Sequence, residues 1–201
     1  MKFWYPTLLA ALISTSASAV EDLRVPGGVA VIPVEADAQP RFNGKPVLTI
    51  QENGQSLAVV GLALSTEPGD YTLESDGQRI PFTVSPKKYL EQRIYLENKR
   101  HVTPNTLDLD RIKKESQKQR GALDAFGGKL DSVRMILPVE GPISGPFGKR
   151  RFFNDQPRRP HSGTDIAAPA GTPIKVAATG RVSLVGDFFF NGRLVVVDHG
   201  E

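Results

Sequence analysis

Short apolar runs separated by turn residues fill the first part of the chain, between residues 25 and 84. The runs are Val29–Ile32, Val47–Ile50, Leu57–Val60 and Ile80–Val84, and the turns between them contain Asn43-Gly44, Asn53-Gly54, Pro68-Gly69-Asp70 and Asp76-Gly77. Asn-Gly pairs are typical of tight hairpin turns, because both residues adopt positive φ at low cost. The pattern predicts a small antiparallel β domain over residues 20–85.

The pattern changes over residues 86–133, where charged residues are frequent and glycine is absent until Gly121. Pro86 and Pro104 stand where first helical turns could begin, so we predict two helices that form a helical linker. Thr103 or Asn105 could cap the second helix. Its apolar stripe is thin and consists of Leu109, Ile112, Leu123 and Phe126. Such a stripe is typical of a helix that lies across a domain rather than one that forms its own bundle.

Glycine-rich β patterning returns in residues 134–201. A long polar loop is predicted before residue 161, and strands are predicted over 172–177, 180–185 and 193–198. Strands with glycine at their corners indicate a compact, curved sheet. The fold class expected for the whole chain is therefore mainly β, with a small antiparallel N-terminal domain, a helical linker and an incomplete glycine-rich antiparallel β domain.

The first 19 residues have the features of an export signal. Lys2 gives a positive start, Leu8–Ile13 is apolar, and Ala17-Ser18-Ala19 provides a small-residue cleavage site. A membrane anchor is the alternative, but this apolar run is shorter than the ~20 residues that a spanning helix needs. No later stretch is apolar enough to span a bilayer. We therefore predict a signal peptide over 1–19 and a mature chain in the periplasm or cell envelope.

The net charge and the absence of cysteine limit which partners and which folding mechanism fit this chain. The net charge of +3 is too balanced to indicate a nucleic-acid partner, and the absence of cysteine means that an exported chain folds by burial alone. Basic residues nevertheless gather just before residue 161, where only Asp155 opposes Lys149, Arg150, Arg151, Arg158 and Arg159. The cluster is either a solvated loop or a cationic rim that attracts an acidic substrate.

His161 and Asp165 lie four residues apart and are candidate zinc ligands. On an extended strand they would be about 13 Å apart, whereas zinc ligands converge within ~2 Å of one ion. A helix would bring them together, but Gly163, Pro160 and Pro169 oppose one. A loop folded at Gly163 is the better prediction. The spacing alone is common, so it indicates only half of a possible metal site.

The surrounding residues resemble a known family. The matching stretches run in order from 141 to 200: Gly141-Pro-Ile-Ser-Gly-Pro-Phe-Gly148, His161-Ser-Gly-Thr-Asp165 with the following residues to Ile174, Ala177-Ala-Thr-Gly-Arg-Val182, and Gly192-Arg-Leu-Val-Val-Val-Asp-His-Gly200. They are similar to the opening of a lysostaphin-type (LytM-like) peptidoglycan metalloendopeptidase domain. The β domain before them resembles the N-terminal domain of some exported Gram-negative members, on pattern and position.

The resemblance implies a zinc ion held by His161, Asp165 and a later histidine, with water in the fourth position. The metal would lower the pKa of that water for attack on a peptide bond of the peptidoglycan cross-links or stem peptides. The family's further histidines, one in a later strand and a His-x-His pair, have no counterpart in residues 1–201. No catalytic residue is therefore assigned, and we expect a truncated chain that holds zinc weakly and lacks catalysis by itself.

Other candidate residues have simpler explanations. His199 resembles a strand-end residue that precedes the family's catalytic histidines and is not a ligand, and His101 is expected at the surface or at a helix cap. Asp198 either orients a histidine or caps a turn. Phe188-Phe189-Phe190 is either a hairpin tip packed on a neighbour or a wall of the substrate site.

Two further functional interpretations stay open beside the zinc endopeptidase. One is a non-catalytic relative that binds peptidoglycan or regulates another wall hydrolase, which the missing histidines favour. The other is a structural β module of the envelope with a coincidental motif. The ordered match over residues 141–200 favours the family interpretation over this last one.

Overall fold

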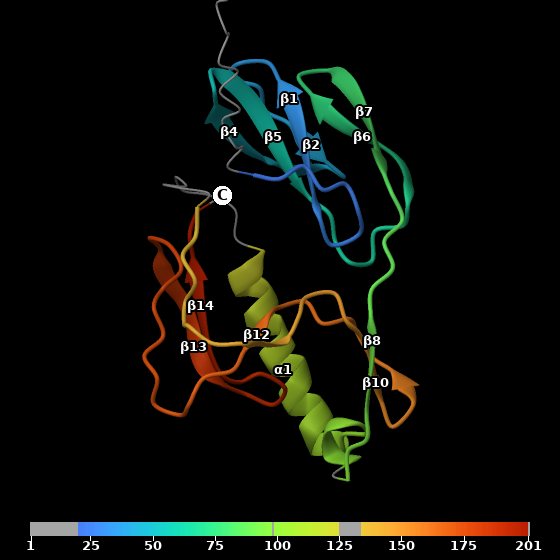
Figure 1. Cartoon of the computed structure of the whole chain (residues 1–201), viewed down its shortest axis with the longest axis vertical. Coiled ribbons are helices and arrows are strands. Elements are labelled where there is room, and N and C mark those ends of the chain that lie inside the picture. Colours follow the sequence, from blue (N-terminus) through green and yellow to red (C-terminus); the bar gives the residue numbers. More distant parts are fainter. Residues whose placement is uncertain (1–19, 98, 125–133, 201) are drawn as a thin grey trace, which may run out of the picture.

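A computed structural model describes residues 20–97, 99–124 and 134–200 of the 201-residue chain. Figure 1 shows two parts, with strands β1 to β7 in the upper part and helix α1 with strands β8 to β14 in the lower part. Strands outnumber helices throughout these residues, which confirms the predicted mainly β fold. The predicted signal peptide over 1–19 lies outside the described residues.

Two antiparallel sheets form the upper part. One has the order β1-β5-β4, from strands Val29–Val34, Gln55–Gly61 and Leu48–Glu52. The other has the order β3-β2-β6-β7, from strands Lys45–Pro46, Arg41–Phe42, Gly69–Ser75 and Gln78–Val84. Every strand pair in the two sheets is antiparallel, as the hairpin pattern predicted.

Three tight turns set the register of these hairpins. Asn43-Gly44 joins β2 to β3, Asn53-Gly54 joins β4 to β5, and Asp76-Gly77 joins β6 to β7, each with positive φ at both residues. Two consecutive residues with positive φ match the right-handed twist of the flanking strands. The turn residues that are visible in the sequence therefore decide which strands pair.

The hydrophobic core of the upper part lies between its two sheets. It combines Ala30 and Ile32 of β1, Ala58 and Val60 of β5, Leu62, Leu73 of β6, and Phe82 and Val84 of β7. Phe42 and Tyr71 pack at its margin, with ring centroids 5.6 and 5.9 Å from that of Phe82. Alternation along each strand places these side chains on the inner faces, so the sequence pattern and the core agree.

The segment after the upper part is extended, which makes the first of the two predicted helices wrong. Residues Glu91–Ile94 form strand β8, which pairs in parallel with β10 (Arg150–Phe153), and β10 pairs with the short strand β11 (Gln156–Pro157). Charge density suggested a helix here, but pairing with a strand about 60 residues later supplies the backbone hydrogen bonds instead. β10 and β11 also lie within the predicted polar loop.

Helix α1 (Thr106–Leu123) confirms the second predicted helix. Asn105 is its N-cap, and the Asn105 side chain accepts a hydrogen bond from the backbone N–H of Asp108. The short 3-10 turn η1 (Lys99–His101) precedes the helix, and Arg100 forms a two-point ion pair with Asp108 at 2.6 and 2.8 Å. Asp108 is the buried residue of the helix, whereas the apolar side chains of Leu107, Leu109 and Leu123 are exposed.

Polar contacts hold α1 against the tip of the hairpin formed by β13 (Arg181–Phe188) and β14 (Gly192–Asp198), beside which it lies in Figure 1. Glu115 accepts hydrogen bonds from the backbone N–H of Phe189 at 2.7 Å and from Arg111 at 2.6 Å. Gln119 donates to Asn191 at 3.1 Å. The ring of Phe189 also packs against that of His101, with centroids 4.8 Å apart. Phe189, at the predicted hairpin tip, is thus packed on η1 and α1, whereas Phe190 is 59% exposed.

The remaining strands of the lower part are short. β9 (Ile143–Gly145) pairs with β12 (Asp165–Ile166) in antiparallel orientation, and β13 pairs with β14 with one register shift. The strands predicted over 180–185 and 193–198 are confirmed by β13 and β14. The strand predicted over 172–177 is wrong, because no residue of this segment belongs to a strand. The segment is a loop that bonds residues 136–138 at two points, from the N–H of Lys175 to the carbonyl of Pro138 at 2.8 Å and from the N–H of Ile136 to the carbonyl of Ala177 at 2.9 Å. Pro173 lacks the N–H that a ladder needs.

Tyr89 connects the two parts of the molecule. Its hydroxyl donates a hydrogen bond to the carbonyl of Pro26 at 2.8 Å, and its ring lies edge-on to Phe147 at 6.5 Å between centroids. A β-carbon on Gly148 would overlap the same ring. The loop around residues 146–148 is therefore packed against the start of the upper part. Within the described residues, no helix combines the length and apolar character that a membrane crossing requires.

Truncation of a core leucine should destabilise the upper part strongly. Leu73 is fully buried, so Leu73→Ala leaves a cavity and should lower the free energy of unfolding by about 3 kcal/mol. Leu107→Ala makes the same chemical change at a side chain that is 81% exposed and should change it by less than about 0.5 kcal/mol. Urea denaturation followed by circular dichroism measures both, and equal effects would contradict the assigned core.

The docking of α1 should weaken in acid. Burial raises the pKa of Glu115, but the N–H of Phe189 and the guanidinium of Arg111 outweigh it and hold the pKa below its ordinary value of 4.5. The Glu115 carboxylate therefore binds a proton less readily in the folded protein than in the unfolded chain. Its contribution to the free energy of unfolding is complete above pH 4.5 and is lost as the pH falls below that value. Glu115→Gln should flatten the fall of unfolding free energy below pH 4.5.

The exposed Glu140 provides a matched control for this pH dependence. Glu140→Gln removes the same kind of carboxylate and should leave the wild-type acid dependence in place. Urea denaturation at a series of pH values provides the comparison. An unchanged pH profile in Glu115→Gln would show that Glu115 does not secure the helix to the hairpin.

Candidate metal site

The loop before His161 fixes the backbone and the ring of this residue. The backbone N–H of His161 donates to Lys149 at 2.8 Å, and its carbonyl accepts from Gly148 at 2.7 Å. The ring Nδ1 lies 3.1 Å from the carbonyl oxygen of Pro146, and the residue is only 8% exposed. Because a carbonyl only accepts, Nδ1 carries the hydrogen and donates it, which leaves Nε2 facing the other way.

Asp165 lies on β12, opposite Gly145 of β9. Its Oδ1 is 3.1 Å from Nε2 of His161, so the chain folds back between the two residues through the bend at Gly163. A loop folded at this glycine was the prediction, and the geometry confirms it. The carboxylate of Asp165 packs directly on Gly145, where a β-carbon would overlap it.

The contact between His161 and Asp165 has the donor chemistry of a metal site. With Nδ1 donating to Pro146, Nε2 offers a lone pair, and an ionised carboxylate oxygen also offers only lone pairs. Two acceptors at 3.1 Å repel one another unless a proton or a cation lies between them. An imidazole nitrogen and a carboxylate oxygen that converge in this way fit two of the ligands of a zinc ion.

The other two histidines lie elsewhere. His199, directly after β14, has its Nδ1 2.8 Å from the carbonyl of Thr179, and His101 packs on Phe189. Across the described ranges, no three residues among histidine, aspartate and glutamate gather closely enough to hold a metal ion. Asp198 accepts a hydrogen bond from the backbone of Gly200 at 2.9 Å, as expected for a turn cap.

Most of the basic cluster beside the site is engaged within the protein. Arg150 pairs with Glu91 at 3.1 Å, Arg151 pairs with Asp165 at 3.1 Å, and Arg158 donates to the carbonyl of Val102 at 2.8 Å. Asp155, the acidic residue within the cluster, instead pairs with Arg93 at 3.0 Å. The contact between Arg151 and Asp165 was not predicted, and residues 150–153 (Arg-Arg-Phe-Phe) carry no alternation of polar and apolar residues that could have indicated it.

A cavity of about 450 Å³ opens next to this loop. Its lining joins the upper part, through residues 64–68, to Tyr89, Gly148 and Pro160 of the site region. Lys87, Lys88 and Arg150 line it as well, opposed by Glu67. The cavity surface is mostly apolar and has a basic margin. One of its lining residues, Pro160, directly precedes His161 in the sequence.

Comparison with known proteins identifies the family. Residues 23–87 match the Peptidase family M23 N-terminal domain, and residues 159–201 match Peptidase family M23. The crystal structure of a Pseudomonas aeruginosa protein assigned to peptidase M23 is 40% identical, with a TM-score of 0.70 over 89% of this chain and 70% of that one. The chain therefore belongs to peptidase family M23, as the sequence motifs predicted.

Two curated relatives match shorter regions. The peptidoglycan DD-endopeptidase ShyA of Vibrio cholerae is 35% identical over 81 residues, which are 39% of this chain and 19% of the relative. An uncharacterized protein of Haemophilus influenzae is 42% identical over 65 residues, which are 32% of this chain and 15% of that protein. The matched region thus spans less than a fifth of either relative.

Filling the space at Gly145 should displace the Asp165 carboxylate. The added methyl group of Gly145→Ala would overlap that carboxylate, so the substitution should lower the free energy of unfolding by about 2 kcal/mol and shift the ring resonances of His161. Gly61→Ala adds the same methyl group where nothing lies within 4 Å and should leave these resonances in place. Urea denaturation and histidine ring NMR test both, and identical spectra in Gly145→Ala would contradict this packing.

Proposed function

We propose that this protein is an exported zinc-dependent endopeptidase that hydrolyses peptide bonds in peptidoglycan. The approach of His161 Nε2 to Asp165 Oδ1 is the observation that carries the proposal, because it joins two ligand types at the positions that the family motif indicates. Membership of peptidase family M23 supports a hydrolase, and the peptidoglycan DD-endopeptidase activity for which the Vibrio cholerae relative is named supports peptidoglycan as the substrate class.

In this proposal His161 and Asp165 are two of the metal ligands. A catalytic zinc site has three protein ligands and one open position, at which the metal activates water for attack on a carbonyl. The described residues around the two ligands fix the positions of the ligand side chains. The carbonyl of Pro146 holds the His161 ring by Nδ1, and the backbone of Gly145 leaves room for the Asp165 carboxylate.

The proposed substrate is compatible with the surroundings of the site. Peptidoglycan stem peptides carry carboxylates, and the cavity that reaches Pro160, next to His161 in the sequence, has Lys87 and Lys88 on its margin. Opposite charges raise the local concentration of a substrate and its rate of encounter. We propose that the cavity admits part of the stem peptide.

The proposal extends to organisation and location. Residues 1–19 are proposed as a signal peptide, 20–85 as a small β domain, 86–133 as a linker and 134–201 as part of the peptidase domain. The proposed location is the periplasm or cell envelope, where peptidoglycan lies. The linker is not purely helical, because β8 pairs with β10 of the proposed peptidase domain.

A non-catalytic relative that binds peptidoglycan is the second candidate. It is favoured by the donor set of the described residues, in which no three histidine, aspartate or glutamate side chains gather closely enough to hold a metal ion. Such a protein would sediment with cell walls and would not cut them. The two candidates differ in one observable, which is loss of cell-wall turbidity that a chelator prevents.

Zinc binding should depend on His161. Because two protein ligands rarely hold the ion against water, the purified chain should bind zinc weakly, with a dissociation constant on the order of micromolar or higher. His161→Ala should remove this binding, and His101→Ala should retain it because His101 packs on Phe189 away from the pair. Competition with a chromophoric chelator measures both. Tight one-to-one zinc binding that survives His161→Ala would contradict the assigned ligands.

The same variants decide between the two candidate functions in a cell-wall assay. The endopeptidase predicts turbidity loss that both a chelator and His161→Ala prevent. The binding protein predicts unchanged turbidity with sedimentation on the walls.

A further inference from the structure

The carboxylate of Asp165 is divided between two partners. Its Oδ1 faces Nε2 of His161 at 3.1 Å, and its Oδ2 accepts a hydrogen bond from Nη2 of Arg151 at 3.1 Å. Each oxygen therefore has one defined neighbour. The two contacts together fix the rotation of the carboxylate about its last side-chain bond, which is otherwise a soft torsion.

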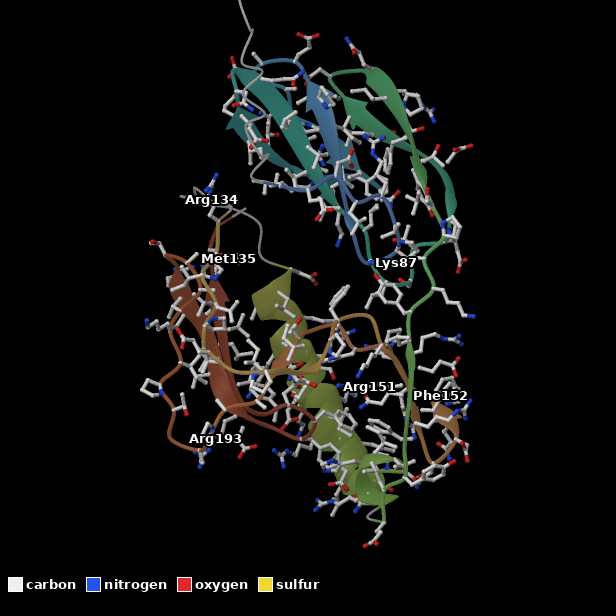
Figure 2. All side chains as sticks on the ribbon, in the orientation of Figure 1. Lys87, Arg134, Met135, Arg151, Phe152 and Arg193 are labelled. Carbon is white, nitrogen blue, oxygen red and sulfur yellow. The ribbon has the colours of Figure 1, made fainter. Side chains whose placement is uncertain are left out.

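The register of β10 explains why Arg151 reaches Asp165 and its neighbour Arg150 does not. Successive side chains on a strand point to opposite faces, and Figure 2 shows Arg151 and Phe152 on opposite sides of β10. Arg150 shares the face of Phe152, with its guanidinium 5.8 Å from the ring centroid, and pairs with Glu91. Arg151 alone of these two points to the site.

The surrounding strands hold Arg151 in place. β10 is paired on one side with β8, with Arg151 opposite Gln92, and on the other side the carbonyl of Arg151 accepts from the N–H of Arg158 at 2.8 Å. The Arg151 side chain is 25% exposed, and its Nε is buried without a hydrogen-bond partner among the described residues. A half-buried guanidinium is costly unless a carboxylate compensates it, so the pair with Asp165 fixes both side chains.

We infer that Arg151 is a positioning residue for the metal ligand Asp165. By binding Oδ2, Arg151 keeps Oδ1 turned toward His161 Nε2, so that the two ligand atoms already converge before a metal ion arrives. Hydrogen-bonded partners of this kind commonly orient metal-ligating carboxylates. The inference rests on the proposed zinc site.

A guanidinium beside a metal site has two opposing effects. Its charge repels a divalent cation, and its hydrogen bond removes the disorder of the ligand. The geometry favours the second effect, because Arg151 occupies the oxygen that faces away from His161 and leaves the ligand oxygen free. Partial exposure of Asp165, whose side chain is 53% exposed, also screens the repulsion through solvent.

Zinc titration of the purified protein with matched arginine variants tests the inference. Arg151→Gln should weaken zinc binding about tenfold, as the loss of such a partner commonly does. Arg150→Gln removes the same charge one residue away and should change the affinity by less than about twofold, because its partner is Glu91. Arg151→Lys keeps the charge without the planar fork and should give an intermediate affinity.

A second measurement separates positioning from a general effect on folding. In metal-free protein, the effects of Arg151→Gln and Asp165→Asn on urea unfolding should be non-additive, whereas those of Arg150→Gln and Asp165→Asn should add. Additivity in both pairs would overturn the inference. Unchanged or tighter zinc binding in Arg151→Gln, while His161→Ala still abolishes binding, would also overturn it and would leave the proposed zinc site standing. Wild-type protein without any His161-dependent zinc binding would instead overturn the proposed site, and the metal role of Arg151 with it.

Discussion

The Asp165 carboxylate is the point on which the candidate site depends. Three elements meet there: the bare backbone of Gly145 on β9, the ring of His161, and the guanidinium of Arg151 on β10. The three contacts depend on one another. The carboxylate fits because Gly145 has no side chain, and its orientation is fixed because each of its two oxygens has a partner. The site is thus formed by a loop and two short sheets, and not by one sequence motif alone.

The segments that hold the Asp165 carboxylate and its partners in place come from distant parts of the chain. β8, which leaves the upper part, pairs with β10 and so sets the face from which Arg151 points. Tyr89, just before β8, packs on the loop that carries Pro146 and Gly148, which in turn hold His161. The upper part and its connecting segment therefore contribute to the geometry of the site without supplying a ligand. The contacts of Tyr89 and the pairing of β8 with β10 therefore link the N-terminal region of the chain to the peptidase region.

Helix α1 is secured by a different kind of interaction. Its leucines are exposed, and its contacts with the β13–β14 hairpin are mainly hydrogen bonds, ion pairs and the packing of one aromatic tip. Hydrophobic burial is not directional, whereas a carboxylate such as Glu115 that accepts from a single backbone N–H and one arginine defines one position. The helix is consequently placed by polar geometry and is sensitive to protonation. This explains why its thin apolar stripe is compatible with a defined position.

Local chemistry allowed the sequence by itself to determine the upper hairpins, the bend between His161 and Asp165 and the family, and it limited the helix cap to Thr103 or Asn105. An Asn-Gly turn or a cap depends on residues next to it, so the pattern is sufficient. The parallel pairing of β8 with β10, the loop over 172–177 and the contact of Arg151 with Asp165 were decided only by the tertiary structure. A charged segment such as 91–94 favours helix or strand according to the partner that satisfies its backbone. That partner lies about 60 residues away, where no local pattern can indicate it.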